Sequence, residues 1–212
     1  MPQQPTTMHR IYDAKLNKER VLLGPGDYFA SCEPLCLHTV LGSCVSVCLW
    51  DEALRCGGMN HFMLPVAQDP ETAFHSDTGR YGINAMELLI NAMLRLGASR
   101  SRLVSKVFGG AHVLTTMSRR NPLPDSNAAF AVEYLQTEGI PIVARDLGGN
   151  LARQLRFLIH TGDAFVRKLG SGAAPRISER ERSYRAALAR PPATVEIFEP
   201  PPPSSQRKGR RR

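Results

Sequence analysis

The sequence lacks any run of about 18 uninterrupted apolar residues, the length that a membrane-spanning helix needs. Its first residues, Met1 to Met8, show no basic start followed by an apolar stretch and so predict no secretory signal peptide. Aromatic residues make up only 7% of the 212 positions, but hydrophobic residues reach 42%, too many for a wholly disordered chain. We therefore expect a globular, cytoplasmic protein that does not span a membrane.

Excess positive charge is scarce outside the C-terminal end. The formal net charge is +8, yet residues 1–170 contain 17 Lys and Arg against 15 Asp and Glu, whereas residues 171–212 contain 10 against 4. A nucleic-acid-binding domain carries its positive charge on a folded face. We expect no specific nucleic-acid site in the globular part. The basic end remains a candidate for weak, salt-sensitive contact with RNA or anionic lipid.

Cysteine is also infrequent, and its number is odd. The five cysteines are Cys32, Cys36, Cys44, Cys48 and Cys56. An odd count in a cytoplasmic setting argues against a disulfide framework. Two pairs are spaced four apart, as in some zinc sites, but Cys48 lies within an apolar run instead of on a turn. We therefore interpret buried cysteines such as Cys48 as small core residues and predict no metal site.

Strand-like segments dominate the first 65 residues. A Gly-Pro-Gly turn at 24–26 divides one apolar stretch into two strands, and residues 1–19 are polar and expected to be loosely ordered. Alternating apolar positions predict a hairpin over 155–169. The full set of predicted strands is 20–30 (two strands), 38–41, 45–50, 56–64, 103–108, 140–146, 155–159 and 164–169.

Two helices are predicted between these strands. Apolar residues spaced three and four apart indicate a helix over 82–96, ended by Gly97. A second helix over 126–138 would begin at Asp125 or Ser126 as N-cap and end at Gly139.

The composition changes after Gly170, where we place the domain boundary. Ser178-Glu179-Arg180-Glu181 fits a capping box that opens a short helix over 178–190. Six prolines then fall between Pro191 and Pro203, followed by the basic end. The sequence therefore predicts a domain over 1–170 and a Pro-rich, basic tail over 171–212, disordered apart from that helix.

A cysteine on a turn and a histidine in the next strand are the candidate chemical groups. Cys44 ends the small-residue turn Gly42-Ser43-Cys44, and His61 follows seventeen residues later in an apolar strand. A neighbouring imidazole activates a thiol as a nucleophile, and turn amides can stabilise an oxyanion. On this interpretation Cys44 is the most thiolate-rich cysteine. From the residues alone, a simple turn and a buried core histidine remain the alternative.

Several segments together resemble the CheD family, the chemoreceptor glutamine deamidases of bacterial chemotaxis. The resemblance runs in matching order through about residues 22–169 and is carried by 41–51, 57–65, 106–111, 146–150 and 161–168. It implies an α/β fold, a mixed-sheet layered sandwich with helices packed outside, similar to that of deamidating toxins. It also implies a Cys–His–Thr catalytic set.

The resemblance assigns two of these residues directly and leaves the third open. The cysteine of the family motif falls on Cys44 and the histidine falls on His61. The threonine of the motif, six residues before the cysteine, falls on His38, with Thr39 one place later. We predict Thr39 as the third catalytic residue and keep His38 as the alternative.

The resemblance implies a protein-glutamine deamidase that acts on chemoreceptor cytoplasmic domains through a Cys44 thioester, without a cofactor or a metal. A CheC-type phosphatase, which some family members bind, is a candidate partner. A cysteine protease or a transglutaminase would use the same dyad. Two further alternatives are a non-catalytic receptor- or phosphatase-binding module with a vestigial site and a nucleic-acid binder that acts through the tail.

Overall fold

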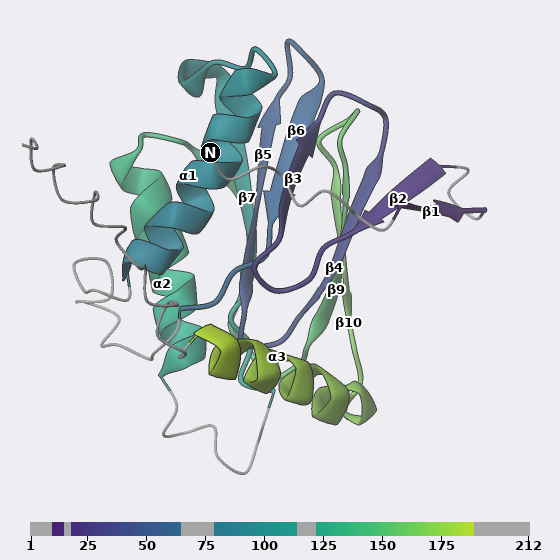
Figure 1. The fold of residues 1–212 in the computed structure, drawn as a ribbon, viewed down its shortest axis with the longest axis vertical. Helices are drawn as coiled ribbons and strands as arrows, with labels where there is room; N and C mark the ends of the chain where they lie inside the picture. The colour runs from purple at the N-terminus through teal and green to yellow at the C-terminus, as the bar shows by residue number, and fades with distance from the viewer. Residues whose placement is uncertain (1–9, 15–17, 65–78, 114–121, 189–212) are drawn as a thin grey trace, which may run out of the picture.

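Two five-stranded mixed sheets form the centre of the computed structural model, which describes residues 10–14, 18–64, 79–113 and 122–188 (Figure 1). The first sheet, in the order β1-β2-β4-β9-β10, consists of Arg10–Asp13, Lys18–Leu22, Cys36–Leu41, Arg153–Leu158 and Ala164–Lys168. The second, in the order β3-β6-β5-β7-β8, consists of Tyr28–Ser31, Cys56–Asn60, Val45–Asp51, Leu103–Gly109 and Ile142–Leu147. Within them, β2 and β4 are parallel, as are β7 and β8.

The helices lie outside this pair of sheets. α1 (Gly79–Arg95) packs on β3 and β6, and α2 (Leu123–Thr137) packs on β5 and β7, while the first sheet covers the other side (Figure 1). α3 (Ala174–Leu188) crosses the end of the sheets. The short 3-10 helices are η2 (Arg100–Arg102) and η4 (Ser171–Ala173). This arrangement confirms the expected mixed-sheet α/β layered sandwich. Among the described helices, none combines the length and the apolarity that crossing a membrane requires.

Two adjacent glycines on β6 allow the three layers to approach closely. A Cβ atom at Gly57 would lie 2.8 Å from the Phe157 ring on β9 of the first sheet. A Cβ atom at Gly58 would lie 2.8 Å from Leu89 on α1. Because successive residues of a strand face opposite sides of the sheet, each glycine serves a different interface. The chain just before His61 is therefore held between the helices and the first sheet.

Most predicted elements are present, with different ends. β9 and β10 form the predicted antiparallel hairpin. α2 begins three residues before the predicted start, and Ser126 is not its N-cap, since it lies in the helix and its hydroxyl donates to the Pro122 carbonyl (2.9 Å). β1 forms within the N-terminal stretch for which no element was predicted. The predictions for residues 1–9 and 189–212 lie outside the described residues.

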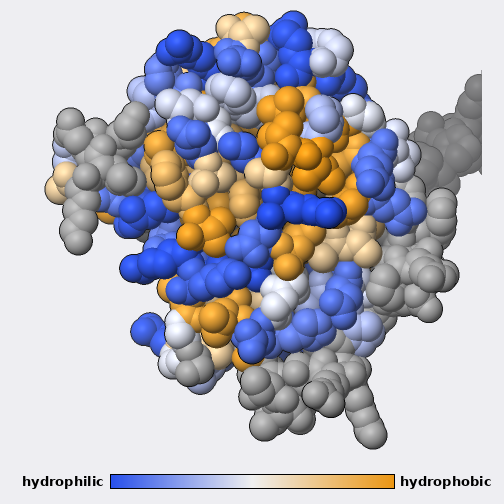
Figure 2. All heavy atoms as spheres, turned by 180° about the vertical axis from the view of Figure 1, so that it is seen from behind, coloured by the Kyte–Doolittle hydropathy of each residue, from blue (hydrophilic) through white to orange (hydrophobic). Residues whose placement is uncertain are grey.

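The surface has an ordinary mixture of polar and apolar groups. Seen from behind, it carries apolar patches that hydrophilic side chains interrupt (Figure 2). The exposed large apolar side chains of the described residues include Val143 on β8 and Phe165 on β10. Exposed apolar residues of this kind are normal for a folded protein.

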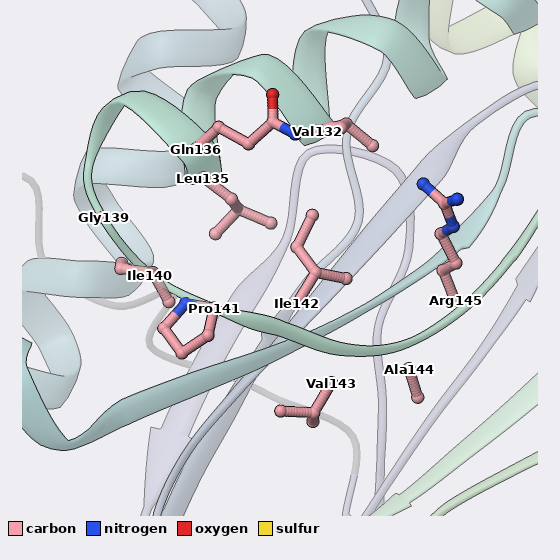
Figure 3. Close-up of a pocket in the computed structure, with 10 residues that line it drawn as sticks. All are labelled: Val132, Leu135, Gln136, Gly139, Ile140, Pro141, Ile142, Val143, Ala144 and Arg145. Carbon is pink, nitrogen blue, oxygen red and sulfur yellow. The ribbon is translucent and has the colours of Figure 1, made fainter.

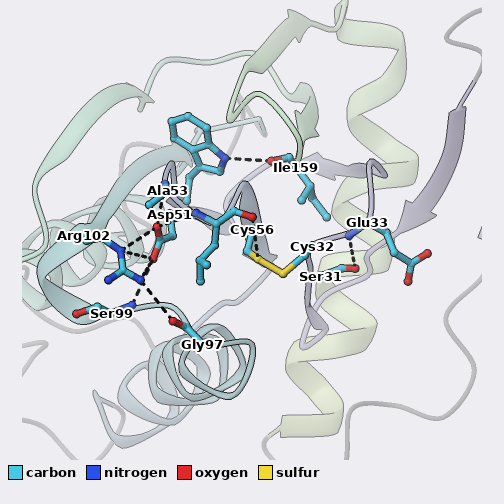
Figure 4. The surroundings of a disulfide bond; sticks show 12 residues. Ser31, Cys32, Glu33, Asp51, Ala53, Cys56, Gly97, Ser99, Arg102 and Ile159 are labelled. Carbon is cyan, nitrogen blue, oxygen red and sulfur yellow. Dashed lines mark hydrogen bonds and ion pairs between the residues drawn. A yellow bond between two sulfur atoms is a disulfide. The ribbon is translucent and has the colours of Figure 1, made fainter.

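Cys32 and Cys56 form a disulfide bond, so the expectation that disulfides are absent is wrong (Figure 4). The physical reason is the register of β3 and β6, which pairs Ser31 with Gly57 in an antiparallel ladder. The next residues on each strand, Cys32 and Cys56, are then directly opposite one another. Cys36, Cys44 and Cys48 are buried.

We expect the double variant Cys32→Ala/Cys56→Ala to lose about 3 kcal/mol of unfolding free energy, because the bond closes a loop of 24 residues in the unfolded chain. Urea denaturation with and without a reductant measures this loss. The reductant should bring the wild-type protein to the stability of the variant and leave the variant unchanged. Equal stability of the oxidised wild-type protein and the variant would contradict the disulfide.

Candidate active site

A chain of two hydrogen bonds determines the protonation of His61. Thr39 lies on β4, and its Oγ1 atom is 2.8 Å from the Leu23 carbonyl oxygen and 2.8 Å from His61 Nδ1. A carbonyl oxygen only accepts, so the single hydroxyl proton of Thr39 is donated to Leu23. Oγ1 must then accept the proton of Nδ1–H. The neutral imidazole therefore has its lone pair on Nε2.

His61 is a neutral base that no other group uses. The residue is only 2% exposed, and its Nε2 atom is buried with no hydrogen-bond partner among the described residues. Burial lowers the pKa of His61 to about 3, and the positive charge of Arg180 contributes to the decrease. At neutral pH the imidazole is therefore uncharged, with Nε2 available to accept a proton.

The second sheet places Cys44 on the same face as His61. Val45 and Phe62 exchange two backbone hydrogen bonds, of 3.0 and 2.9 Å, in an antiparallel bridge that extends the β5–β6 ladder. Paired residues share a face and successive residues alternate. Cys44 and His61, which precede Val45 and Phe62, therefore face the same side. Thr39 comes from the first sheet, so its bond with His61 joins the two sheets on the face to which Cys44 also belongs.

His38, the alternative third residue, points elsewhere. Its Nε2 atom is 2.8 Å from Gln154 Nε2, a contact in which the amide donates to the imidazole. Burial lowers the pKa of His38 to about 4, aided by the charges of Arg20 and Arg156. The structure thus brings Thr39 to His61 and leaves His38 on the other side of β4.

The segment 109–111 also holds the turn that carries Cys44. The Gly110 amide donates to the Cys44 carbonyl (2.8 Å), and the Ala111 amide donates to the Gly42 carbonyl (2.7 Å). Gly109 has φ +119°, and a Cβ atom there would lie 2.1 Å from the Cys44 carbonyl oxygen. A side chain at position 109 is therefore incompatible with this turn.

Asn127 is a positioning residue that the sequence analysis missed. It is fully buried on α2, its Nδ2 donates to the Ser43 carbonyl (2.9 Å), and its Oδ1 accepts from the Leu64 amide (2.8 Å). One side chain thus ties the turn of Cys44 to the segment that follows His61. The period-3.6 pattern of the helix identifies it as buried but does not indicate these partners.

Glu181 on α3 occupies the amides of the turn. Its Oε1 accepts from the backbone amides of Gly42 (3.0 Å) and Cys44 (3.2 Å). Its Oε2 accepts from the Ser43 amide (3.1 Å) and the Ser43 hydroxyl (2.6 Å). The capping-box prediction was wrong, because α3 begins at Ala174 and Glu181 bonds to the turn instead of to the start of its own helix.

The same carboxylate also influences the protonation of Cys44. Burial raises the pKa of the fully buried Cys44 thiol well above its usual value, and the charge of Glu181 and its hydrogen bond with the thiol raise it further. In this conformation Cys44 is therefore held as a thiol, and its rank among the cysteines in thiolate content stays a prediction. Both the thiol and the imidazole are neutral here.

A separate hollow lies away from this site. It is formed by α2 and β8 and is lined by residues that include Val132, Gln136, Ile142 and Arg145 (Figure 3). Thr39, Cys44 and His61 do not line it. In the described part of the chain, no three His, Cys, Asp or Glu side chains gather as metal ligands would.

The fold and this junction define a class of layered α/β proteins in which a turn cysteine and a threonine-bound histidine share one face. Residues 63–168 match the family model described as CheD chemotactic sensory transduction, and the chain belongs to the CheD family. Two relatives are each named probable chemoreceptor glutamine deamidase CheD 1. One, from Shewanella oneidensis, is 43% identical over 90% of this chain and 93% of its own length. The other, from Burkholderia thailandensis, is 43% identical over 95% of this chain and 89% of its own length.

We expect iodoacetamide to label Cys44 of the folded chain slowly, at a rate that still increases above pH 9. The thiolate is the reactive form, and a raised pKa moves its formation to higher pH. Peptide mapping by mass spectrometry measures the rate, and the same protein in denaturant serves as the control for an unshifted thiol. A labelling rate that levels off below pH 9 would contradict the assigned surroundings of Cys44.

Proposed function

We propose that this chain is a protein-glutamine deamidase that hydrolyses glutamine side-chain amides of chemoreceptors to glutamate and ammonia. The observation that supports this best is the free Nε2 lone pair of His61 on the face that carries Cys44. The names of the relatives from Shewanella oneidensis and Burkholderia thailandensis point to the same reaction. Cys44 acts as nucleophile, His61 as base and acid, and Thr39 as the residue that positions His61.

The first half of the reaction forms a thioester. His61 Nε2 takes the thiol proton, and the thiolate attacks the carboxamide carbon of the glutamine. The carbonyl electron pair moves to oxygen, where the amides of Gly42, Ser43 and Cys44 donate to the resulting oxyanion. The oxyanion collapses, the C–N bond breaks, and the imidazolium returns its proton to the leaving nitrogen, which departs as ammonia.

The second half consumes one water molecule. His61 Nε2 removes a proton from water, and the hydroxide adds to the thioester carbon. Collapse of this intermediate breaks the C–S bond, and Cys44 regains its proton from the imidazolium. The glutamic acid side chain that remains releases the other water proton to solvent and becomes a carboxylate. The chemistry uses the side chains of this chain, the turn amides and water.

The finer assignments belong to the same proposal. The substrate is the cytoplasmic domain of a chemoreceptor, which places the reaction in the cytoplasm, and a CheC-type phosphatase is a candidate partner. The catalytic domain ends near residue 170. A vestigial binding module would not need the Thr39–His61 hydrogen bond, whose effect is to leave Nε2 unprotonated.

Replacing the nucleophile should abolish the reaction. We expect Cys44→Ala to lower deamidation of a soluble receptor cytoplasmic fragment at least about a thousandfold, because the thioester cannot form. Ammonia release and a mass increase of about 1 Da per modified glutamine measure the reaction. The matched control is Cys48→Ala, which should remain active. Cys48 is also a buried cysteine and lies on β5, the strand that begins directly after Cys44. Full turnover by Cys44→Ala would exclude this nucleophile.

Thr39→Val should lower kcat about a hundredfold with little change in KM, because the imidazole loses the acceptor that keeps its proton on Nδ1. Thr39→Ser retains an acceptor oxygen and should recover most of the activity. Steady-state kinetics on the receptor fragment separate kcat from KM, and thermal melting compares the stability of the two variants. Equal kcat in Thr39→Val and the wild-type protein would contradict the positioning role.

A further inference from the structure

Side chains of α3 approach the backbone of three glycines closely. A Cβ atom at Gly26 would lie 2.6 Å from the Tyr184 hydroxyl, one at Gly42 would lie 3.0 Å from Ile177, and one at Gly24 would lie 2.7 Å from the Arg180 guanidinium. The 24–26 loop is itself bonded to the histidine strand, since the Gly26 amide donates to the His61 carbonyl (2.7 Å). Gly24, Gly26 and Gly42 therefore form a glycine surface on which a helix fits closely.

One carboxylate of α3 faces this glycine surface. Glu181 is 7% exposed, whereas Glu179, two residues earlier, is exposed. Four donors of the Gly42–Cys44 turn bind the Glu181 carboxylate, and none of the ion pairs of the described residues includes it. A buried carboxylate that three backbone amides and one hydroxyl bind, with no cation paired to it among the described residues, marks a site built to receive negative charge on oxygen.

Glu181 is also the chemical equivalent of the reaction product. Deamidation turns a glutamine carboxamide into a glutamate carboxylate of nearly the same shape, attached to the same side chain. During attack by Cys44, the carboxamide oxygen must reach the turn amides, among them the amide of Cys44 itself. Those amides are where the Glu181 oxygens lie.

The site beneath α3 is closed. Cys44 is 0% exposed and His61 is 2% exposed, so a substrate glutamine cannot reach either while α3 is in place. The negative charge of Glu181 beside the thiol also opposes formation of the thiolate.

We propose that α3 occupies the substrate-docking surface of its own chain, with Glu181 in the place of the glutamine to be deamidated, and inhibits the enzyme until α3 leaves. The inference rests on the proposed function, which it deepens. The surface selects a helical substrate segment that presents a glutamine inward, with an apolar residue four positions before it and an aromatic residue three positions after it, as Ile177 and Tyr184 stand around Glu181.

The first test measures access to Cys44 without any substrate. Glu181→Ala removes the carboxylate, and Glu179→Ala on the exposed face of the same helix makes the same change in charge. We expect iodoacetamide to label Cys44 about tenfold faster or more in Glu181→Ala than in the wild-type chain, with Glu179→Ala unchanged, since several charge-assisted hydrogen bonds are lost. Equal labelling rates in all three proteins would overturn the inference.

The same three proteins are then assayed on a soluble receptor cytoplasmic fragment. We expect kcat/KM to rise about tenfold in Glu181→Ala only. Fragment deamidation at one common rate by all three proteins would refute inhibition by α3 and leave the proposed function intact. Faster labelling of Cys44 in Glu181→Ala, with no deamidation of the fragment by any protein, would instead refute the proposed function.

A second substitution of Glu181, Glu181→Gln, tests whether α3 lies where a substrate lies. Its new carboxamide should be hydrolysed by Cys44 of the same chain, with one water consumed and one ammonia released. We expect the mass of the peptide that contains position 181 to increase by about 1 Da after purification and incubation, and to stay constant in Cys44→Ala/Glu181→Gln. An amide that persists with Cys44 present would show that α3 does not lie as a substrate does, and would overturn the inference.

Discussion

The hydroxyl of Thr39 is the constraint on which the site depends. Its one proton is committed to the Leu23 carbonyl, so its oxygen can only accept, and His61 Nδ1 is the donor it accepts from. This bond connects the two sheets, because Thr39 lies on β4 and His61 follows β6. It also determines which imidazole nitrogen is free. Without this bond, Cys44 and His61 would still share a face, but nothing would determine which ring nitrogen of His61 carries the proton.

Residues of two other segments hold the tight turn that carries Cys44. Gly109 and Gly110 bring a backbone strand up to the Cys44 carbonyl, and Asn127 joins the turn to the segment after His61. The turn amides that this creates face one way and need an acceptor. In the conformation described here, Glu181 meets that need, at the cost of burying a carboxylate that four donors stabilise. The same contacts that complete the fold thus block the chemistry.

Local patterns in the sequence predicted much of the fold and two residues of the candidate site. Strand alternation predicted the β9–β10 hairpin, and the turn before Val45 and the apolar strand of His61 were found from short segments. What could not be predicted depends on register or on distant contacts. Cys32 and Cys56 pair because of the β3–β6 alignment. Thr39 was favoured over His38 only through the family resemblance, because the contact with His61 depends on which side of β4 faces it. Glu181 lies 137 residues from Cys44 in the chain and, from its local sequence alone, fits a capping box equally well.

Thr39 holds His61 as a neutral imidazole with its proton on Nδ1. Nitrogen NMR of the full chain labelled with ¹⁵N-histidine measures this directly, since protonated and unprotonated ring nitrogens differ widely in chemical shift. The His61 signals are assigned by their loss in a His61→Gln variant. We expect a protonated Nδ1 and an unprotonated Nε2 throughout the neutral pH range, because the pKa of His61 is lowered to about 3. A proton on Nε2, or an imidazolium at neutral pH, would contradict it.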